Sequence, residues 1–256
     1  MSHRPTRAVL ALAFVLALLL AACGSTSDEA DTGAAEGPDT TAGAEPDEPA
    51  PDRTIVALGD SIFAWNDSES IPDVIGATLD RPVINASVSG AHFDLPDGAE
   101  EAADDGLDIR RQYDALGQTG FDWVVLDGGG NDVNDSCGCG QCSEVLDAMV
   151  SSDGTSGSIP EFVTRVVADG STVMFVGYYE LPAEAEGFGD CGDELQEQST
   201  RLALMAAGID GVHFVSAADV VTASNTAAYD EDLVHPSPEG SRIVGEYVAE
   251  AILAAE

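Results

Sequence analysis

The stretch Thr54-Ile55-Val56-Ala57-Leu58-Gly59-Asp60-Ser61 is a short, β-branched apolar run that ends in a glycine and two polar residues. A run that is apolar throughout, without alternation of polar and apolar positions, is typical of a strand buried on both faces of a parallel sheet. Later runs along the chain have the same character. We therefore expect five strands, over residues 54–58, 82–86, 123–127, 172–177 and 211–216.

Segments with helical spacing of apolar residues separate these strands, and we expect helices over residues 109–116, 143–150, 161–168 and 194–207. Ser158 and Glu161 have the spacing of a capping box, which predicts that Ser158 caps the third of these helices. A last helix is expected from Pro238, with Ser237 as its cap. Strands that alternate with helices predict an α/β domain with three layers, α/β/α, around a mostly parallel five-stranded sheet.

Residues with catalytic potential follow three of the expected strands. Ser61 comes just after the first strand, Gly90 after the second and Asn131 after the third. Because the carboxyl ends of parallel strands border one crevice, we expect these three residues to lie close together. Asp232 and His235 lie three residues apart, just before the last expected helix.

These residues supply the parts needed for acyl transfer. A serine hydroxyl is a weak nucleophile until a base accepts its proton, and a carboxylate holds the imidazole of such a base in the right tautomer. We therefore expect Ser61 as the nucleophile, His235 as the base and Asp232 as the residue that orients it. The backbone N–H groups of Ser61 and Gly90 and the side-chain amide of Asn131 suit an oxyanion hole.

The order of four motifs resembles the four blocks of the SGNH, or GDSL-type, hydrolase family. The motifs are Gly59-Asp60-Ser61, Asn85-Ala86-Ser87-Val88-Ser89-Gly90, Gly129-Gly130-Asn131-Asp132 and Asp232-Leu233-Val234-His235-Pro236. The resemblance covers residues 53–256 and implies a flavodoxin-like sheet and an esterase or lipase-type activity without a metal ion or other cofactor. It also implies Ser61, Gly90, Asn131 and His235 as the key positions, with Asp232 completing the triad.

We therefore expect a serine esterase that hydrolyses carboxylic esters through an acyl-enzyme at Ser61. Short-chain esters, acetylated glycans and lysophospholipids all remain open as substrates. The first motif continues Ile62-Phe63-Ala64-Trp65 and the second Ala91-His92-Phe93, which depart from the usual pattern of the family. We expect the bulky aromatic residues in these two stretches to narrow the acyl pocket. The alternative function is a non-catalytic extracytoplasmic lipoprotein that binds an acylated or glycan ligand in the same crevice.

The N-terminal segment has the pattern of an export signal. Arg4 and Arg7 precede an apolar run over residues 8–22, and small residues lead to Cys23 in Leu20-Ala21-Ala22-Cys23. This segment resembles a bacterial lipoprotein signal. The resemblance implies that residues 1–22 are removed, that Cys23 is lipidated and that the protein is anchored outside the cytoplasm to the bacterial cell membrane.

Residues 23–52 are expected to form a disordered acidic tether. After Cys23 they contain only Gly, Ser, Thr, Ala, Pro, Asp and Glu, which offer no large apolar side chain to bury. A flexible chain of this length reaches about 30 Å, enough to hold a folded domain off a membrane surface. Residues 53–256 have ordinary globular composition and are expected to form one monomeric domain.

The formal charge of the chain is −38, and all of its Lys and Arg residues are arginines. Nucleic acid is not expected as a partner, because phosphate binding needs clustered basic residues. The expected partners are a small ester or acylated substrate and the membrane, through the lipid on Cys23. Both a saline medium and compositional drift in a lysine-poor genome are open as origins of the charge.

The remaining cysteines are Cys137, Cys139, Cys142 and Cys191. In an oxidising compartment these four predict two disulfides, and sequence alone leaves all three pairings open. We expect one of the three clustered cysteines to bond Cys191. The alternative is a four-cysteine zinc site, for which the spacing Cys-x-Cys-x-x-Cys lacks the usual two paired knuckles.

Overall fold

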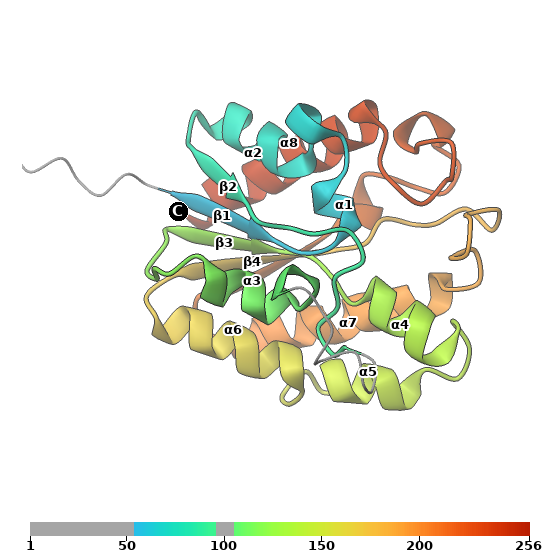
Figure 1. Cartoon of the computed structure of the whole chain (residues 1–256), viewed down its shortest axis with the longest axis horizontal. Coiled ribbons are helices and arrows are strands. Elements are labelled where there is room, and N and C mark those ends of the chain that lie inside the picture. The colour runs from blue at the N-terminus through green and yellow to red at the C-terminus, as the bar shows by residue number, and fades with distance from the viewer. Residues whose placement is uncertain (1–53, 96–104) are drawn as a thin grey trace, which may run out of the picture. The chain divides into compact units, whose positions relative to one another are not determined.

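The computed structural model describes residues 54–95 and 105–256 (Figure 1). The expected signal segment 1–22, the lipidation site Cys23 and the expected tether 23–52 lie outside the described residues. Among the described helices, none has the length and apolar character needed to span a membrane.

The centre of the domain is a five-stranded sheet with the order β2-β1-β3-β4-β5, and all its neighbouring strands pair in parallel. This confirms the expected α/β fold, and the strand order is that of flavodoxin-like folds. The strands are β1 (Ile55–Leu58), β2 (Val83–Asn85), β3 (Trp123–Leu126), β4 (Thr172–Gly177) and β5 (Val212–Ser216).

Helices cover both faces of the sheet and complete the three expected layers. In Figure 1, α1, α2 and α8 lie on one side of the strands and α3 to α7 on the other. The α-helices are α1 (Ser61–Ala64), α2 (Ile71–Leu79), α3 (Ile109–Ala115), α4 (Gly130–Cys137), α5 (Ser143–Met149), α6 (Ser158–Ala168), α7 (Gly192–Gly208) and α8 (Pro238–Ala255). Short 3-10 helices are η1 (Asp67–Glu69), η2 (Asp105–Leu107), η3 (Ala217–Asp219) and η4 (Thr226–Ala228).

Successive strand residues point into two separate cores, as the twofold period of a strand requires. In β1, Val56 and Leu58 pack toward α3–α7, whereas Ile55 and Ala57 pack toward α1, α2 and α8. All four side chains are fully buried. The sheet is therefore covered on both faces, which explains why its central strands are apolar throughout.

One predicted helix cap is right and one is wrong. The Ser237 hydroxyl accepts a hydrogen bond from the Gly240 N–H at 3.1 Å and caps α8 as expected. Ser158 does not cap α6, because it is already the first residue of that helix. Its cap is Gly157, at φ 122°, where a β-carbon would clash with the backbone of Met149. The Ser158 hydroxyl instead donates to Asp94 at 2.9 Å.

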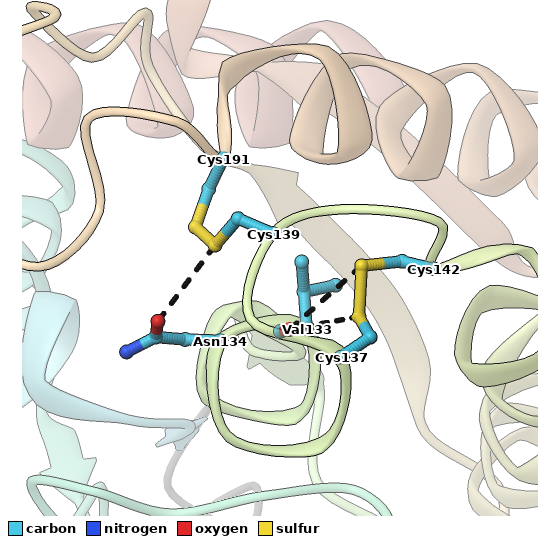
Figure 2. The surroundings of a disulfide bond; sticks show 6 residues. All are labelled: Val133, Asn134, Cys137, Cys139, Cys142 and Cys191. Atoms are coloured by element: carbon cyan, nitrogen blue, oxygen red, sulfur yellow. Dashed lines mark hydrogen bonds between the residues drawn. A yellow bond between two sulfur atoms is a disulfide. The ribbon is translucent and has the colours of Figure 1, made fainter.

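Two disulfides join the four described cysteines, as expected (Figure 2). Cys137 bonds Cys142, and Cys139 bonds Cys191, which confirms that one of the clustered cysteines pairs with Cys191. All four sulfur atoms are used in these bonds, so the alternative of a four-cysteine zinc site is wrong. Elsewhere in residues 54–95 and 105–256, no group of His, Cys, Asp and Glu side chains is arranged to hold a metal ion.

Candidate active site

Ser61 is the first residue of the short helix α1, directly after β1. The residue before it, Asp60, caps this helix by accepting a hydrogen bond from the Ile62 N–H at 2.9 Å. Gly59 makes the turn possible, because a β-carbon there would clash with the side chain of Asp127. The tight turn places the Ser61 hydroxyl at the carboxyl end of the sheet, where it is half-buried.

His235 and Asp232 meet Ser61 from the loop before α8. His235 Nε2 lies 2.9 Å from the Ser61 hydroxyl oxygen, and His235 Nδ1 lies 2.6 Å from Asp232 Oδ2. The other Asp232 oxygen accepts hydrogen bonds from the backbone N–H groups of Val234 and His235, at 2.9 and 3.0 Å. The three-residue spacing thus folds into a turn that directs both side chains to one side. The three predicted residues form one continuous hydrogen-bonded chain.

The carboxyl of Asp232 is held in its ionised form. Partial burial by itself raises its pKa, but the hydrogen bonds from His235 and from two backbone N–H groups outweigh this and lower the pKa below its usual value. An ionised carboxylate at Nδ1 fixes the tautomer of His235 in which Nε2 is free to accept a proton. The arrangement can therefore move the proton of Ser61 to His235.

Asn131 lies beside Ser61, whereas Gly90 lies in a neighbouring turn. Asn131 is the second residue of α4 and lines the same cavity as Ser61. Its side-chain Nδ2 donates to the carbonyl of Ala91 at 2.9 Å, which ties it to the residue after Gly90. Gly90 has φ 81° in a turn closed by the bond from the Ala91 N–H to the Val88 carbonyl at 3.1 Å.

The segment that carries Gly90 is joined to the turn before Ser61. The Val88 N–H donates to the Gly59 carbonyl at 3.1 Å, which extends the pairing of β2 with β1 beyond the strands themselves. Gly90 is not among the residues that line the cavity at Ser61. The structure therefore brings Ser61, His235, Asp232 and Asn131 together directly, and Gly90 through its neighbours.

Sequence reasoning missed Tyr178, which connects the two sides of the site. Its hydroxyl donates to Asp60 Oδ2 at 2.6 Å and accepts from the Gly130 N–H at 2.8 Å. Burial, followed by the charges of Asp60 and Asp127, holds the pKa of Tyr178 well above its usual value, so the phenol keeps its proton. Tyr178 directly follows β4. Because the carboxyl ends of parallel strands border one crevice, the reasoning that pointed to Asn131 could also have identified Tyr178.

Asp60 and Asp127 form a buried pair of carboxyl groups beneath Ser61. The Asp60 N–H donates to Asp127 Oδ1 at 3.1 Å, and each residue is only 2% exposed. Burial raises the pKa of both groups, and for Asp127 the charge of Asp60 raises it further. The pair supports the turn that carries Ser61.

Trp65 and Asn66, which follow α1, hold the loop that carries His235. The Trp65 ring stacks on the His235 ring with centroids 3.8 Å apart and planes 8° from parallel. Its indole N–H donates to Asp230 Oδ2 at 2.9 Å. Asn66 Nδ2 donates to the Pro236 carbonyl at 2.7 Å. One short segment thus carries Ser61 and two side chains that hold the loop of His235 in place.

The cavity beside Ser61 is small and mostly apolar. Its volume is about 20 Å³, enough for roughly one water-sized group. Ser61 and Asn131 border it together with the larger side chains of Ile62, Tyr178, Leu181, Phe188, Leu195 and Val234. A second cavity of about 220 Å³, which reaches Glu180 and Ser199, shares Tyr178, Leu181 and Leu195 with it.

The residues expected to narrow the acyl pocket do not line it. Trp65 covers His235 instead. Phe63 is fully buried in the core beneath α1, α2 and α8, and Phe93 is fully buried against Phe175 in the core beneath α3–α7. His92 is buried, and its Nε2 contacts Asp135 at 3.1 Å rather than the cavity. The prediction failed because the chain after Gly90 turns into the core. Phe188 and Leu181, from the segment before α7, narrow the pocket in their place.

A family model described as the GDSL-like Lipase/Acylhydrolase family matches residues 57–243, which include Ser61, Gly90, Asn131, Asp232 and His235. A search of curated protein sequences gives no significant match.

Several solved structures have the same fold at low sequence identity. A carbohydrate acetylesterase from Sinorhizobium meliloti superposes with a TM-score of 0.59 at 17% identity, covering 80% of this chain and 100% of that one. A putative arylesterase from Agrobacterium tumefaciens superposes with a TM-score of 0.59 at 17% identity, covering 79% of this chain and 99% of that one. An inhibitor-bound aryl esterase from M. smegmatis gives 0.58 at 16%, with the same coverage of 79% and 99%. At such identities the likeness concerns the fold.

Proposed function

The chain belongs to the GDSL-like lipase/acylhydrolase family, and from that premise we propose that it is a serine esterase acting through an acyl-enzyme at Ser61. The observation that carries the proposal is the continuous chain from Ser61 Oγ through His235 to Asp232, with contacts of 2.9 and 2.6 Å. Nucleophile, base and orienting carboxylate stand in the relation that acyl transfer requires.

In the proposed reaction, Ser61 Oγ attacks the ester carbonyl carbon while its proton passes to His235 Nε2. Asp232 stabilises the imidazolium that forms. The carbon–oxygen bond to the alcohol then breaks, and His235 gives its proton to the departing alcohol. Water attacks the acyl-enzyme with His235 again as the base, which releases the acid and restores the hydroxyl of Ser61.

The negative oxygen formed at each step needs hydrogen-bond donors. We assign the backbone N–H groups of Ser61 and Gly90 and the side-chain amide of Asn131 to this role. Asn131 Nδ2 carries two hydrogens, and its bond to the Ala91 carbonyl uses one of them, which orients the other. Loss of one such donor typically costs about 100- to 1000-fold in turnover.

The cavity beside Ser61 favours a short acyl group. A volume of about 20 Å³ with apolar walls suits the methyl group of an acetyl ester, and a longer chain would have to extend toward the cavity of about 220 Å³ on the far side of Tyr178, Leu181 and Leu195. The solved structures of similar fold include a protein described as a carbohydrate acetylesterase and one described as an aryl esterase. The net charge of −38 disfavours polyanionic substrates and nucleic acid.

We also propose that the protein acts as a monomer outside the cytoplasm, anchored to the membrane by a lipid on Cys23. The motif Leu20-Ala21-Ala22-Cys23 supports the lipid anchor. Cys23→Ala is expected to release the protein from cell membranes into the soluble fraction. Continued incorporation of labelled fatty acid into the Cys23→Ala protein would refute it.

An acyl-length series tests the esterase proposal. Purified wild-type protein should hydrolyse nitrophenyl acetate faster than the butyrate or octanoate, and Ser61→Ala should fall to the background rate. Ser143→Ala is the matched control, because Ser143 is exposed at the start of α5. A fluorophosphonate probe should label wild type and Ser143→Ala but not Ser61→Ala. Equal background rates for wild type and Ser61→Ala would instead favour a non-catalytic binding protein.

A further inference from the structure

We infer that the disulfide between Cys139 and Cys191 sets the acyl-chain specificity of the site, because it fixes residues 181–191 as a wall of the cavity beside Ser61. This inference rests on the proposed esterase function and adds to it a determinant of substrate choice. For brevity, residues 181–191 are called the wall segment.

The wall segment contributes two apolar side chains, Leu181 and Phe188, to the cavity that Ser61 and Asn131 border. Phe188 is half-buried and packs against the core beneath α3–α7. The cavity volume of about 20 Å³ therefore depends on where this segment lies. An outward shift of Phe188 would enlarge the space available to an acyl chain.

The wall segment has no α-helix or strand of its own. Consecutive turns fold it, with the Phe188 N–H bonded to the Ala185 carbonyl at 3.2 Å and the Cys191 N–H to the Phe188 carbonyl at 2.9 Å. A contact of 2.9 Å from the Glu186 N–H to the Asp232 carbonyl ties it to the loop of the base. These bonds give the segment a shape, and none of them reaches α4.

The disulfide supplies a covalent tie between the wall segment and α4. Figure 2 shows Cys191, at the start of α7, bonded to Cys139 in the loop after α4. The opposite end of α4 carries Asn131. The bridge therefore holds Phe188, three residues before Cys191, to the helix that begins at the oxyanion side of the site.

The second disulfide provides a matched control within the same loop. Cys137 and Cys142 are five residues apart, so their bond closes only a local turn, whereas Cys139 and Cys191 are 52 residues apart. Neither Cys137 nor Cys142 touches the wall segment through its disulfide. Comparing the two variants, each lacking one disulfide, separates the effect of freeing the wall segment from the effect of losing any crosslink.

The experiment compares kcat/KM for nitrophenyl acetate, butyrate and octanoate in wild type, Cys139→Ala/Cys191→Ala and Cys137→Ala/Cys142→Ala. We expect the octanoate-to-acetate ratio to rise on the order of tenfold in Cys139→Ala/Cys191→Ala, the gain from burying about two further methylene groups. The ratio for Cys137→Ala/Cys142→Ala should stay at the wild-type value. Phe188→Ala, which opens the wall directly, should raise the ratio in the same direction.

A reversible version avoids dependence on refolding without the bridge. In folded Cys137→Ala/Cys142→Ala, the Cys139–Cys191 bond is the one disulfide left among residues 54–95 and 105–256. A phosphine reductant should raise the octanoate-to-acetate ratio of this variant, and reoxidation should restore it. The same reductant should not raise the ratio of Cys139→Ala/Cys191→Ala further.

An unchanged ratio after reduction, with thiol titration showing the bond open, would overturn the inference. An equal rise in both double variants would also overturn it, because the effect would then belong to crosslinking in general. If wild type hydrolyses none of the three esters, the proposed function fails. If it hydrolyses them but the octanoate-to-acetate ratio does not depend on the Cys139–Cys191 disulfide, only the inference about the wall segment fails.

Discussion

At the scale of single residues, Trp65 illustrates how His235, the proposed base, is kept in position. His235 lies in a loop, and its ring is held at Nδ1 by Asp232 and on one face by the Trp65 indole. A stacked aromatic pair contributes roughly 0.5–1.5 kcal/mol, and the indole N–H bond to Asp230 adds a neighbouring restraint. Trp65 therefore acts as a positioning residue through His235.

We predict that Trp65→Ala lowers kcat by about 10- to 100-fold with little change in KM, since a misplaced base slows chemistry without weakening substrate binding. Trp65→Phe retains a ring that can stack on His235 but has no N–H for Asp230, so it should recover most of kcat. Steady-state kinetics on nitrophenyl acetate measures both effects, with circular dichroism as the check on folding. A rise in KM at unchanged kcat would assign Trp65 to substrate binding instead.

Residue identity and spacing were sufficient to predict Ser61, Asp232, His235 and Asn131 as neighbours, because each lies at a strand end or in a short turn. The contacts of Tyr178 and Trp65 were not predictable in this way. The Tyr178 bond to Asp60 joins residues 118 positions apart, and the Trp65 bond to Asp230 joins residues 165 apart. Which side chains meet across such distances depends on the packing of the whole fold.

At the scale of elements, the five strands were predicted, whereas the helices α1, α2 and α4 were not. The central strands β1, β3 and β4 are buried almost throughout, so their apolar composition identifies them, and the edge strands β2 and β5, which are partly exposed, still carry β-branched residues. In contrast, α1 has only four residues, and α4 is polar along most of its length. In α4, the carboxylate of Asp132 is buried, and it accepts hydrogen bonds from the backbone N–H groups of Phe93 and Asp94 at 3.1 and 2.7 Å. Such a helix has no apolar periodicity to detect.

The start of α2 did carry a signal in the sequence. Ser70 and Asp73 form a capping box, in which the Ser70 side chain accepts from the Asp73 N–H and the Asp73 carboxylate from the Ser70 N–H. Pro72 lies in the first turn, where a missing N–H costs nothing. The same type of motif was misleading at Ser158, since a glycine with φ 122° already turns the chain into α6.

The junction of β1, β3 and α1 carries a pH-dependent cost in stability. Asp127, just after β3, has a raised pKa in the folded state, first because it is buried and then because of the charge of Asp60. Below the ordinary carboxyl pKa of 3.8 both folded and unfolded states hold this proton. As pH rises from there toward the folded-state pKa, the unfolded chain releases its proton first, so Asp127 progressively destabilises the fold.

We predict that Asp127→Asn raises the free energy of unfolding at neutral pH by on the order of 1 kcal/mol, because the amide replaces a carboxyl that resists ionisation. The gain should shrink toward zero as pH falls to the ordinary carboxyl pKa. Urea unfolding from pH 4 to pH 7 measures it, with Glu250→Gln, an exposed charge on α8, as the control. A gain that is independent of pH would show that the carboxyl pair is not its source.

At the scale of the whole molecule, the main feature is a large excess of negative charge. The chain has 47 acidic residues against 9 arginines and no lysine. The arginines of residues 54–95 and 105–256 all lie in ion pairs, as with Arg81 between Asp122 and Glu256 and Arg201 between Asp147 and Glu197. Local pairing therefore leaves a large excess of negative charge, which repels itself across the folded surface.

This repulsion predicts that sodium chloride stabilises the protein. The range of the interaction falls from about 30 Å at 0.01 M salt to about 3 Å at 1 M, so added salt removes most of the long-range cost. We expect the thermal midpoint to rise by about 5 °C over this range, equivalent to 1–2 kcal/mol for a chain of this size. Differential scanning calorimetry at pH 7 measures this rise in the thermal midpoint. Near the sequence pI of about 4.1 the net charge is small, so the same addition of sodium chloride should change the thermal midpoint little. A salt effect of equal size at both pH values would mean that salt acts on burial of apolar surface rather than on charge.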